Sequence, residues 1–286
     1  MLFALPGQVD RALNGTVEQL CLIGGVVLTM IGVVLGTGWI SYLAGRVLLR
    51  FGRRPAMLLA GRRLTADPWN GSRTQAALLA TVVAGAIAIG YRQYMITEFQ
   101  SYDRFNALLG YEEGGMGPPD SIGFYLGAVR LILIAVAIGM TVAAAGVLVA
   151  LAESIVARRR SYAALTAVGV PRQVLSESVA WHTFAPLVPA LLIAVAAGAA
   201  IVRSIGTEFT QTSGEQVCRA TEALCAADPQ TYTEYVVTNQ VVLAVPVPWG
   251  GLALLLGFAL VMTLLAVGAG FMVLRSSTDL EELRAG

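Results

Sequence analysis

The sequence predicts an all-α integral membrane protein with five transmembrane helices, its N-terminus outside the cell and its C-terminus inside. Three observations lead to this prediction: the composition, the number of long apolar runs, and the alternating charge of the segments between those runs. Of the 286 residues, 56% are hydrophobic and 13% are charged, whereas an ordinary soluble domain has about 25% charged residues. A soluble protein needs polar residues to cover its surface, so this composition indicates a lipid environment.

Five apolar runs are long enough to cross a bilayer, because about 20 helical residues span about 30 Å of hydrocarbon. The first run is longer than the apolar core of a secretion signal, and Arg11 is the only basic residue before it. We therefore expect this run to stay in the protein as an anchor. The five runs are Leu20–Leu43, Ala76–Ile96, Ile122–Leu151, Val179–Val202 and Trp249–Leu274.

The charge of the connecting segments sets the predicted orientation. The segment after the first run holds seven arginines and one aspartate, and the next, Thr97–Ser121, holds one arginine and five carboxylates. The third segment holds four arginines and two glutamates, and the fourth, Ser204–Val245, again holds one arginine and five carboxylates. Because basic segments are retained in the cytoplasm, the first and third segments are predicted to lie inside and the other two outside.

The residue content also excludes several kinds of chemistry. The chain contains no lysine, and both the phosphate-binding loop of nucleotide hydrolases and a Schiff-base site need the lysine amine. No cofactor is therefore expected in this chain, and ATP and Mg²⁺ are assigned to a partner. A net charge of +1 gives no basic field for nucleic acid. One histidine, His182, cannot build a zinc site with Cys21 buried in a span, so no metal site is expected, and no span carries a catalytic pair typical of an intramembrane enzyme.

The two basic segments are predicted to contain helices rather than plain linkers. Val47–Arg63 alternates apolar residues with arginine pairs at a helical period, which predicts one helix along the inner membrane face, and Asp67–Gly71 is predicted as a turn. Ser154–Val168 is predicted as an amphipathic helix that ends at Gly169 and Pro171, with a second short helix from Arg172. The third and fourth spans are thus joined by a cytoplasmic helix–turn–helix.

The outer segments are predicted to be small. Gly110–Asp120 is expected to form a flexible turn, and Ser204–Val245 is expected to hold a short helix and little more. Cys218 and Cys225 share this outer segment. In one helix they would lie about 10.5 Å apart along the axis, beyond disulfide reach, so a disulfide between them predicts a turn or break in the segment.

The segment from Glu153 to Leu175, with the sequence ESIVARRRSYAALTAVGVPRQVL, resembles the signature of the FtsX-like permeases, the type VII ABC transporter family that includes MacB. There a transmembrane helix runs into a charged stretch, a turn and the next span. The resemblance covers Ala60–Leu274. Ser161, where the family commonly has an acidic residue, the short outer segment Thr97–Ser121 and the extra first span depart from the family pattern.

The resemblance implies a domain organisation like the C-terminal half of a ten-span permease. An N-terminal segment and extra span (1–45) precede a cytoplasmic amphipathic linker (46–75). The four-span permease unit follows (76–275), with a coupling segment at 152–177, and a cytoplasmic tail (276–286) ends the chain.

The function implied by the resemblance is that of a multi-pass permease subunit in the cell membrane. It would couple ATP hydrolysis by two copies of a cytoplasmic ABC ATPase to export, or outer-leaflet extraction, of an amphiphile, lipid-like compound or peptide. It would contact membrane lipid and pair with a second permease half or another copy of itself. The alternative is mechanotransmission, in which the subunit regulates an extracytoplasmic cell-wall hydrolase or a sensor kinase without transport.

The residues expected to couple the permease to its ATPase lie around the cytoplasmic turn. Tyr162, Leu165 and Val168 are spaced to form an apolar helix face, and the arginines beside them are suited to partner carboxylates or lipid phosphate. The arginines are also explained by cytoplasmic retention alone, but the break at Gly169 and Pro171 is not. The full set is Glu153, Arg158, Arg159, Arg160, Tyr162, Leu165, Val168, Gly169, Pro171 and Arg172.

Proline and glycine within the spans suggest where helices bend and where they touch. Pro186 and Pro189 are predicted to kink the fourth span and form a hinge, because each removes a backbone donor. Several glycines are predicted to permit close contact between helices. They are Gly24, Gly25, Gly32, Gly36, Gly38, Gly139 and Gly146.

Overall fold

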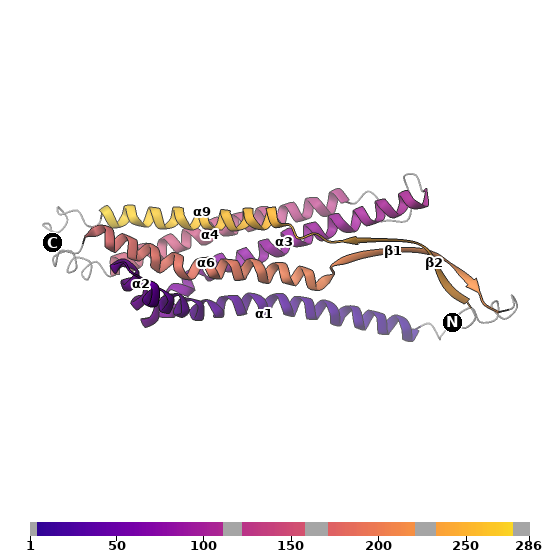
Figure 1. Ribbon diagram of the computed structural model, residues 1–286, viewed down its shortest axis with the longest axis horizontal. Helices are drawn as coiled ribbons and strands as arrows, with labels where there is room; N and C mark the ends of the chain where they lie inside the picture. The colour runs from indigo at the N-terminus through magenta and orange to yellow at the C-terminus, as the bar shows by residue number, and fades with distance from the viewer. Residues whose placement is uncertain (1–4, 111–121, 158–170, 221–232, 277–286) are drawn as a thin grey trace. The chain divides into compact units, whose positions relative to one another are not determined.

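A computed structural model describes residues 5–110, 122–157, 171–220 and 233–276. The helices and strands follow one another along the chain as labelled in Figure 1. They are α1 (Leu5–Phe51), α2 (Pro55–Ala66), α3 (Pro68–Leu109), α4 (Ile122–Ala157), α6 (Arg172–Ile205), β1 (Glu208–Cys218), β2 (Thr233–Ala244) and α9 (Trp249–Ser276).

The predicted membrane fold is confirmed. Among the described residues, five helices contain a stretch long and apolar enough to cross a membrane. The helical and membrane-spanning character predicted from the sequence therefore holds, while the orientation of the spans stays a prediction. The five stretches are Ile23–Phe51, Gln75–Leu109, Ile122–Ser154, Ser176–Ile205 and Trp249–Gly270.

The chain divides into two compact units. The first comprises Met1–Ile87, Leu133–Ile201 and Trp249–Gly286, and the second comprises Ala88–Ile132 and Val202–Pro248. The core of the first unit is built from fully buried aliphatic side chains of α3, α4 and α6. They include Leu78, Leu79, Val82, Val83, Met140, Val147, Leu187 and Leu191.

Close helix contacts in the first unit centre on α3. A Cβ atom built on Gly85 would lie 2.7 Å from Leu255 of α9 and 3.0 Å from Val136 of α4. A Cβ on Gly198 of α6 would lie 2.6 Å from the Cβ of Ala86. The atoms near Gly85 belong to side-chain methyl groups, whereas those near Gly198 are fixed to the backbone, so at Gly198 only glycine allows the two helices to pack this closely. The span in α3 is 50% buried and that in α1 is 18% buried.

The predicted glycine contacts were mostly wrong. Gly139 does meet Thr81, with 3.0 Å between the side-chain methyl and an added Cβ. In contrast, an added Cβ would meet nothing within 4 Å at Gly24, Gly25, Gly32, Gly36 or Gly146. The reason is that these glycines of α1 and α4 face away from the other described helices of this chain.

The predicted single helix over Val47–Arg63 is also wrong. α1 continues through the end of the first span to Phe51, and α2 starts at Pro55. At the break, a Cβ on Gly52 would collide with the carbonyl oxygen of Leu48. Arg54 is extended, with φ −99° and ψ 142°, as expected for a residue before proline. Gly52 and Pro55 thus divide the segment into two helices, because proline is favoured at the first helical position.

In three other segments the helices are longer than predicted. Only Asp67 separates α2 from α3, which starts at Pro68, so the predicted turn Asp67–Gly71 is reduced to one residue. α3 continues to Leu109, through much of the predicted loop Thr97–Ser121. The helix that starts at Arg172 is not short, because it continues as α6 through the fourth span. Helical backbone hydrogen bonding therefore extends well beyond the apolar runs.

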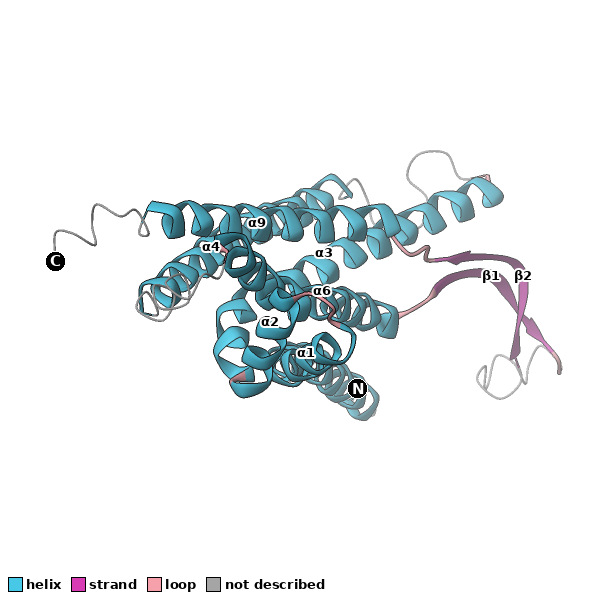
Figure 2. Cartoon of the chain, turned by 60° about the vertical axis from the view of Figure 1, so that its left-hand side comes forward, coloured by secondary structure: helices cyan, strands magenta, loops and turns pink. Residues whose placement is uncertain are grey.

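The largest correction concerns the outer segment 204–245, which contains a β-hairpin rather than a short helix (Figure 2). β1 and β2 pair antiparallel from Glu208 opposite Ala244 to Cys218 opposite Thr233, with a register shift between Ser213 and Gly214. β2 is rich in valine, threonine and tyrosine, residues that favour strands. One face near the base of the hairpin is half-buried and the other is exposed, which is the alternation expected of a strand.

Candidate functional site

Of the predicted coupling segment, the structure describes only the residues on either side of 158–170. Seven of the predicted residues lie in 158–170, outside the described residues: Arg158, Arg159, Arg160, Tyr162, Leu165, Val168 and Gly169. Before this segment, α4 ends at Ala157, and after it Pro171 directly precedes α6. The contacts of these flanks define the candidate site.

The first flank is held by α2. The guanidinium of Arg63 donates a hydrogen bond from Nη2 to Oγ of Ser154, at 3.1 Å. Ser154 lies in the last turn of α4, and Arg63 lies in the last turn of α2. This contact connects residues 91 positions apart in sequence, so the linker helix is tied to the end of the third span.

Glu153, a predicted coupling residue, is exposed beside this contact. It lines a groove of about 650 Å³ whose other walls are apolar. A carboxylate on an apolar surface is suited to a partner that presents both an arginine and an apolar side chain. The other lining residues are Leu148, Val149, Ala152, Val156, Ala157 and Ala269.

The second flank is held by the other end of α2. Arg54, directly before α2, forms a salt bridge from Nη1 to Oε1 of Glu177 at 3.0 Å. The side chains are 72% and 37% exposed, so the pair contributes only about 0 to 1 kcal/mol to stability. Its effect is mainly geometric: it ties the first turns of α6 to the break between α1 and α2. Pro171 is exposed, its carbonyl accepts the amide of Val174 at 3.0 Å, and the side chain of Arg172 lies outside the described part.

An apolar cluster fixes α2 between α1 and α6. Its buried members are Leu48, Ala60 and Leu64, and Met57, Trp181 and Ala185 pack against them. Two glycines bring α1 and α2 together: a Cβ on Gly45 would lie 3.1 Å from the carbonyl oxygen of Gly61, and a Cβ on Gly61 would lie 3.0 Å from that of Gly45. α2 therefore cannot shift without moving the start of α6.

The predicted hinge starts directly after this cluster, because Pro186 follows Ala185. Pro186 and Pro189 are inside α6, and each lacks the amide that a helix normally supplies to the carbonyl four residues earlier. Close by, Nε2 of Gln75 in α3 donates to the carbonyl oxygen of Thr183 at 3.3 Å. Gln75 is 5% exposed, so this is a buried polar contact between two spans. The hinge itself stays a prediction.

The structure thus adds four residues to the site that the sequence did not single out. Arg54, Arg63, Glu177 and Gln75 contact the flanks or the proline region of α6. The charges of Arg54, Arg63 and Glu177 were counted in the cytoplasmic segments, but pairing over such sequence distances cannot be read from a single chain. Only Gln75 gave a local signal, because it is a polar residue directly before the apolar run that starts at Ala76.

Contacts at both ends of the described part of the hairpin, in the second unit, connect it to α3 and join its two strands. The rings of Tyr94 in α3 and Phe209 in β1 are 4.6 Å apart between centroids. Arg219, directly after β1, and Glu234 of β2 form a salt bridge. Cys218 is disulfide-bonded, while Cys225 lies outside the described residues, so their pairing stays a prediction. The break that such a pairing requires does exist, because β1 ends at Cys218.

Comparison with known proteins identifies the family. A family model described as "FtsX-like permease C-terminal" matches residues 133–278, which is half of the chain. The match includes most of α4, the coupling segment, α6, the hairpin and α9. No curated protein and no solved structure matches the chain. Permease domains of this family are generally non-enzymatic membrane components that work with an ABC ATPase. The chain therefore belongs to the FtsX-like permease family and is a membrane permease component of an ABC-type system.

Proposed function

We propose that this chain couples ATP hydrolysis by two copies of a cytoplasmic ABC ATPase to the export, or outer-leaflet extraction, of an amphiphile, lipid-like compound or peptide. It acts in the plasma membrane and pairs with a second permease half or a second copy of itself, while ATP and Mg²⁺ bind to the ATPase. One observation carries the proposal: α2 contacts both flanks of the segment 158–170, at Ser154 and at Glu177.

The contacts suggest how movement of the ATPase reaches the spans. The ATPase binds the segment 158–170, whose apolar positions and arginines are suited to a groove with carboxylates at its rim. A shift of this segment moves the end of α4 and the start of α6. Because α2 is tied to both, it holds the two ends in a fixed relation, and the bend falls at Pro186 and Pro189, where the helix lacks backbone hydrogen bonds.

The spans themselves favour a substrate that comes from the membrane. Many large apolar side chains on the described spans are exposed, among them Leu131, Leu192 and Leu254, and lipid is their natural surrounding. The groove beside Glu153 combines one carboxylate with an apolar wall. A substrate with apolar and polar parts matches the apolar spans and this groove better than a hydrophilic solute does.

The first prediction tests the coupling role directly. Replacing Gly169 and Pro171 together with alanine is expected to reduce substrate-stimulated ATP hydrolysis by the reconstituted complex about tenfold or more, because the turn predicted at the end of the coupling helix is then lost. The chain should still insert into the membrane in normal amount, since the spans are unchanged. Equal ATP hydrolysis and equal transport in the variant and the unaltered chain would refute the role of this turn.

Mechanotransmission is the second candidate, and the hairpin favours it. Only Gly206 and Thr207 separate α6 from β1, and four residues separate β2 from α9, so movement of either helix is passed directly to the hairpin. Toward the far end of its described part, the hairpin exposes Val217 and Val236 on one face and Val237 on the other, and exposed apolar side chains are suited to a protein partner.

Shortening the hairpin separates the two candidates. Residues 213–239 are replaced by Asn-Gly, which closes the remaining pairs from Glu208 opposite Ala244 to Thr212 opposite Gln240 with a two-residue turn. If the chain signals, the response of the hydrolase or kinase should be lost while ATP hydrolysis persists. If the chain transports, export should persist at a measurable rate. Transport that is unaffected, with no loss of any cell-wall response, would exclude mechanotransmission through the hairpin.

A further inference from the structure

The end of α1 carries two arginines that the coupling site does not use. Arg46 and Arg50 lie in the last two turns of the first membrane-spanning stretch, which ends at Phe51. Both side chains are exposed, and neither forms an ion pair within the described residues. Arg54, the next arginine but one, is already paired with Glu177. Two cations at the edge of a span therefore lack a counter-ion from the described part of this chain.

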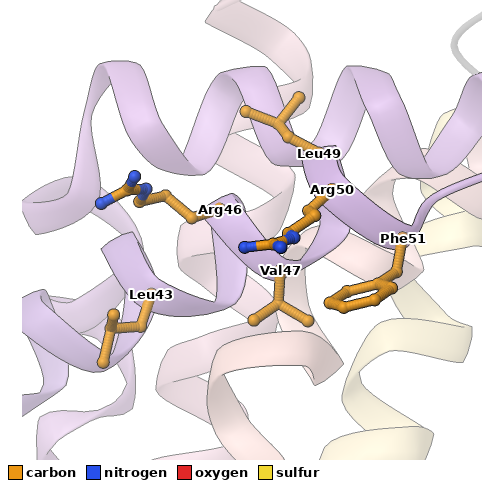
Figure 3. Close-up of a pocket in the computed structure, with 6 residues that line it drawn as sticks. All are labelled: Leu43, Arg46, Val47, Leu49, Arg50 and Phe51. Carbon is orange, nitrogen blue, oxygen red and sulfur yellow. The ribbon is translucent and has the colours of Figure 1, made fainter.

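These arginines line a pocket together with apolar side chains (Figure 3). Its volume is about 600 Å³. Figure 3 shows Arg46 and Arg50 projecting from the same helix, with Leu43 on the side of Arg46 and with Val47 and Phe51 on the side of Arg50. Leu49 completes the lining. Cationic and apolar groups thus alternate along a surface that runs parallel to the span.

The two guanidinium groups are oriented by neighbouring rings. The Cζ atom of Arg46 lies 5.9 Å from the centre of the Tyr42 ring, and that of Arg50 lies 5.8 Å from the centre of the Phe51 ring. Contacts of this kind attract the cation to the ring face and leave the N–H groups free for an acceptor. Residues four positions apart lie on one helix face, so one phosphate group is able to accept hydrogen bonds from both arginines.

We propose that this pocket binds an anionic phospholipid of the surrounding leaflet. Arg46 and Arg50 hold the phosphate, and an acyl chain lies along Leu43 and Val47. The apolar lining and the position at the edge of a span favour a lipid over free phosphate, because a small hydrophilic anion gains nothing from Leu43 or Phe51. Of the proposed function, this proposal uses only the location in a membrane. It does not depend on the direction of transport.

The consequence of this binding lies at the break between α1 and α2. Gly52 follows Arg50 by two residues, and Arg54 starts the contacts of α2 with the coupling flanks. A lipid bound at Arg46 and Arg50 fixes the end of α1, and through the close contact between Gly45 and Gly61 it also restrains α2. The lipid is therefore a positioning element for the linker helix.

The test uses the full-length protein purified in a neutral detergent, with bound lipid counted by native mass spectrometry. Added phosphatidylglycerol should bind more tightly than phosphatidylcholine, which has the same chains but no net charge. The double variant Arg46→Gln with Arg50→Gln should bind phosphatidylglycerol about tenfold more weakly, because both charge-assisted contacts are lost. The matched control, Arg92→Gln with Arg203→Gln, removes two other exposed arginines and should bind it as the unaltered chain does.

Three results would overturn the proposal. They are equal binding of phosphatidylglycerol by the Arg46/Arg50 variant and the unaltered chain, an equal loss in the Arg92/Arg203 control, and displacement of the lipid by millimolar inorganic phosphate, which would indicate a site for a free anion. A second readout checks that the variant is folded: its unfolding temperature without added lipid should match that of the unaltered chain. Phosphatidylglycerol should raise this temperature in the unaltered chain and not in the variant.

Discussion

Replacing Gly198 with leucine is expected to destabilise the first compact unit by about 3 kcal/mol or more, at the upper end of the effects of overpacking. A Cβ at this position would lie 2.6 Å from the Cβ of Ala86 and 2.9 Å from the carbonyl oxygen of Val83. One of these is a backbone atom and the other is attached directly to the backbone, so no side-chain rotation relieves the clash. α6 would have to move away from α3, and the buried contacts of Leu187 and Leu191 would be lost with it.

The measurement is the unfolding temperature of the purified chain in detergent, together with the amount of monodisperse protein on gel filtration. Gly146→Leu is the matched control, because Gly146 also lies within a span but has nothing within 4 Å of an added Cβ. The control should match the unaltered chain in both measurements. A Gly198→Leu protein that is equally stable would show that α3 and α6 do not approach as closely as described.

Replacing Gly61 with leucine is expected to abolish most of the stimulation of ATP hydrolysis by substrate while leaving the spans folded. A side chain at Gly61 would meet the carbonyl oxygen of Gly45 at 3.0 Å and a side-chain carbon of Leu49 at 2.9 Å, so α2 must move away from α1. The contacts of α2 with Ser154 and Glu177 depend on its position. Under the coupling proposal, substrate-stimulated ATP hydrolysis should fall at least about tenfold, as expected when a closing or gating element is displaced.

The control for this variant is Gly32→Leu, a change of the same size on α1 at a position that is open. Both variants should be present in the membrane in normal amount. ATP hydrolysis and transport should be unaffected in the control. Normal coupling in the Gly61→Leu protein would mean that α2 is only a connection between spans and has no part in transmitting movement.

The spans could be predicted from the sequence because the signal lies in the composition of consecutive residues. An apolar run of about 20 residues has one stable environment whatever its neighbours are, so all five runs were found. The ends of the helices were not found, since α3 continues to Leu109 and α6 starts at Arg172. Polar residues at a helix end make the same backbone hydrogen bonds as apolar residues do, so the helix continues past the apolar run. The break at Gly52 and Pro55 was missed because the apolar residues and the pairs Arg53-Arg54 and Arg62-Arg63 keep a helical period across it.

The hairpin was missed for a different reason. Between residues 204 and 245 the polar content suggested a solvated connection, but the valine, threonine and tyrosine residues of β2 carried a strand signal. The two strands stabilise each other across a connection of 14 residues, from Cys218 to Thr233, and such a pairing is not visible in either strand alone. The disulfide prediction did contain the necessary hint, since it required a break after Cys218.

The candidate site was proposed from the sequence, but the contacts of its flanks could not be. The arginine run and the predicted turn at Gly169 and Pro171 rest on a local sequence pattern. Arg54 with Glu177 and Arg63 with Ser154 are pairs separated by 123 and 91 residues, and a single sequence contains many arginines and acceptors that satisfy the same chemistry. Only the packing of Leu48, Leu64 and Trp181, which fixes α2, selects these partners.

The most direct test of the central claim, that α2 ties the flanks of the coupling segment together, is a charge exchange between Arg54 and Glu177. Arg54→Glu and Glu177→Arg are each made alone and then combined, and substrate-stimulated ATP hydrolysis is measured in the reconstituted complex with its partner ATPase. We expect each single variant to lose most of the stimulation, since two like charges then replace the ion pair that joins Arg54 to the start of α6. The combined variant should recover it, because the pair is restored with its sign reversed. Full activity in either single variant, or no recovery in the combined variant, would contradict the account.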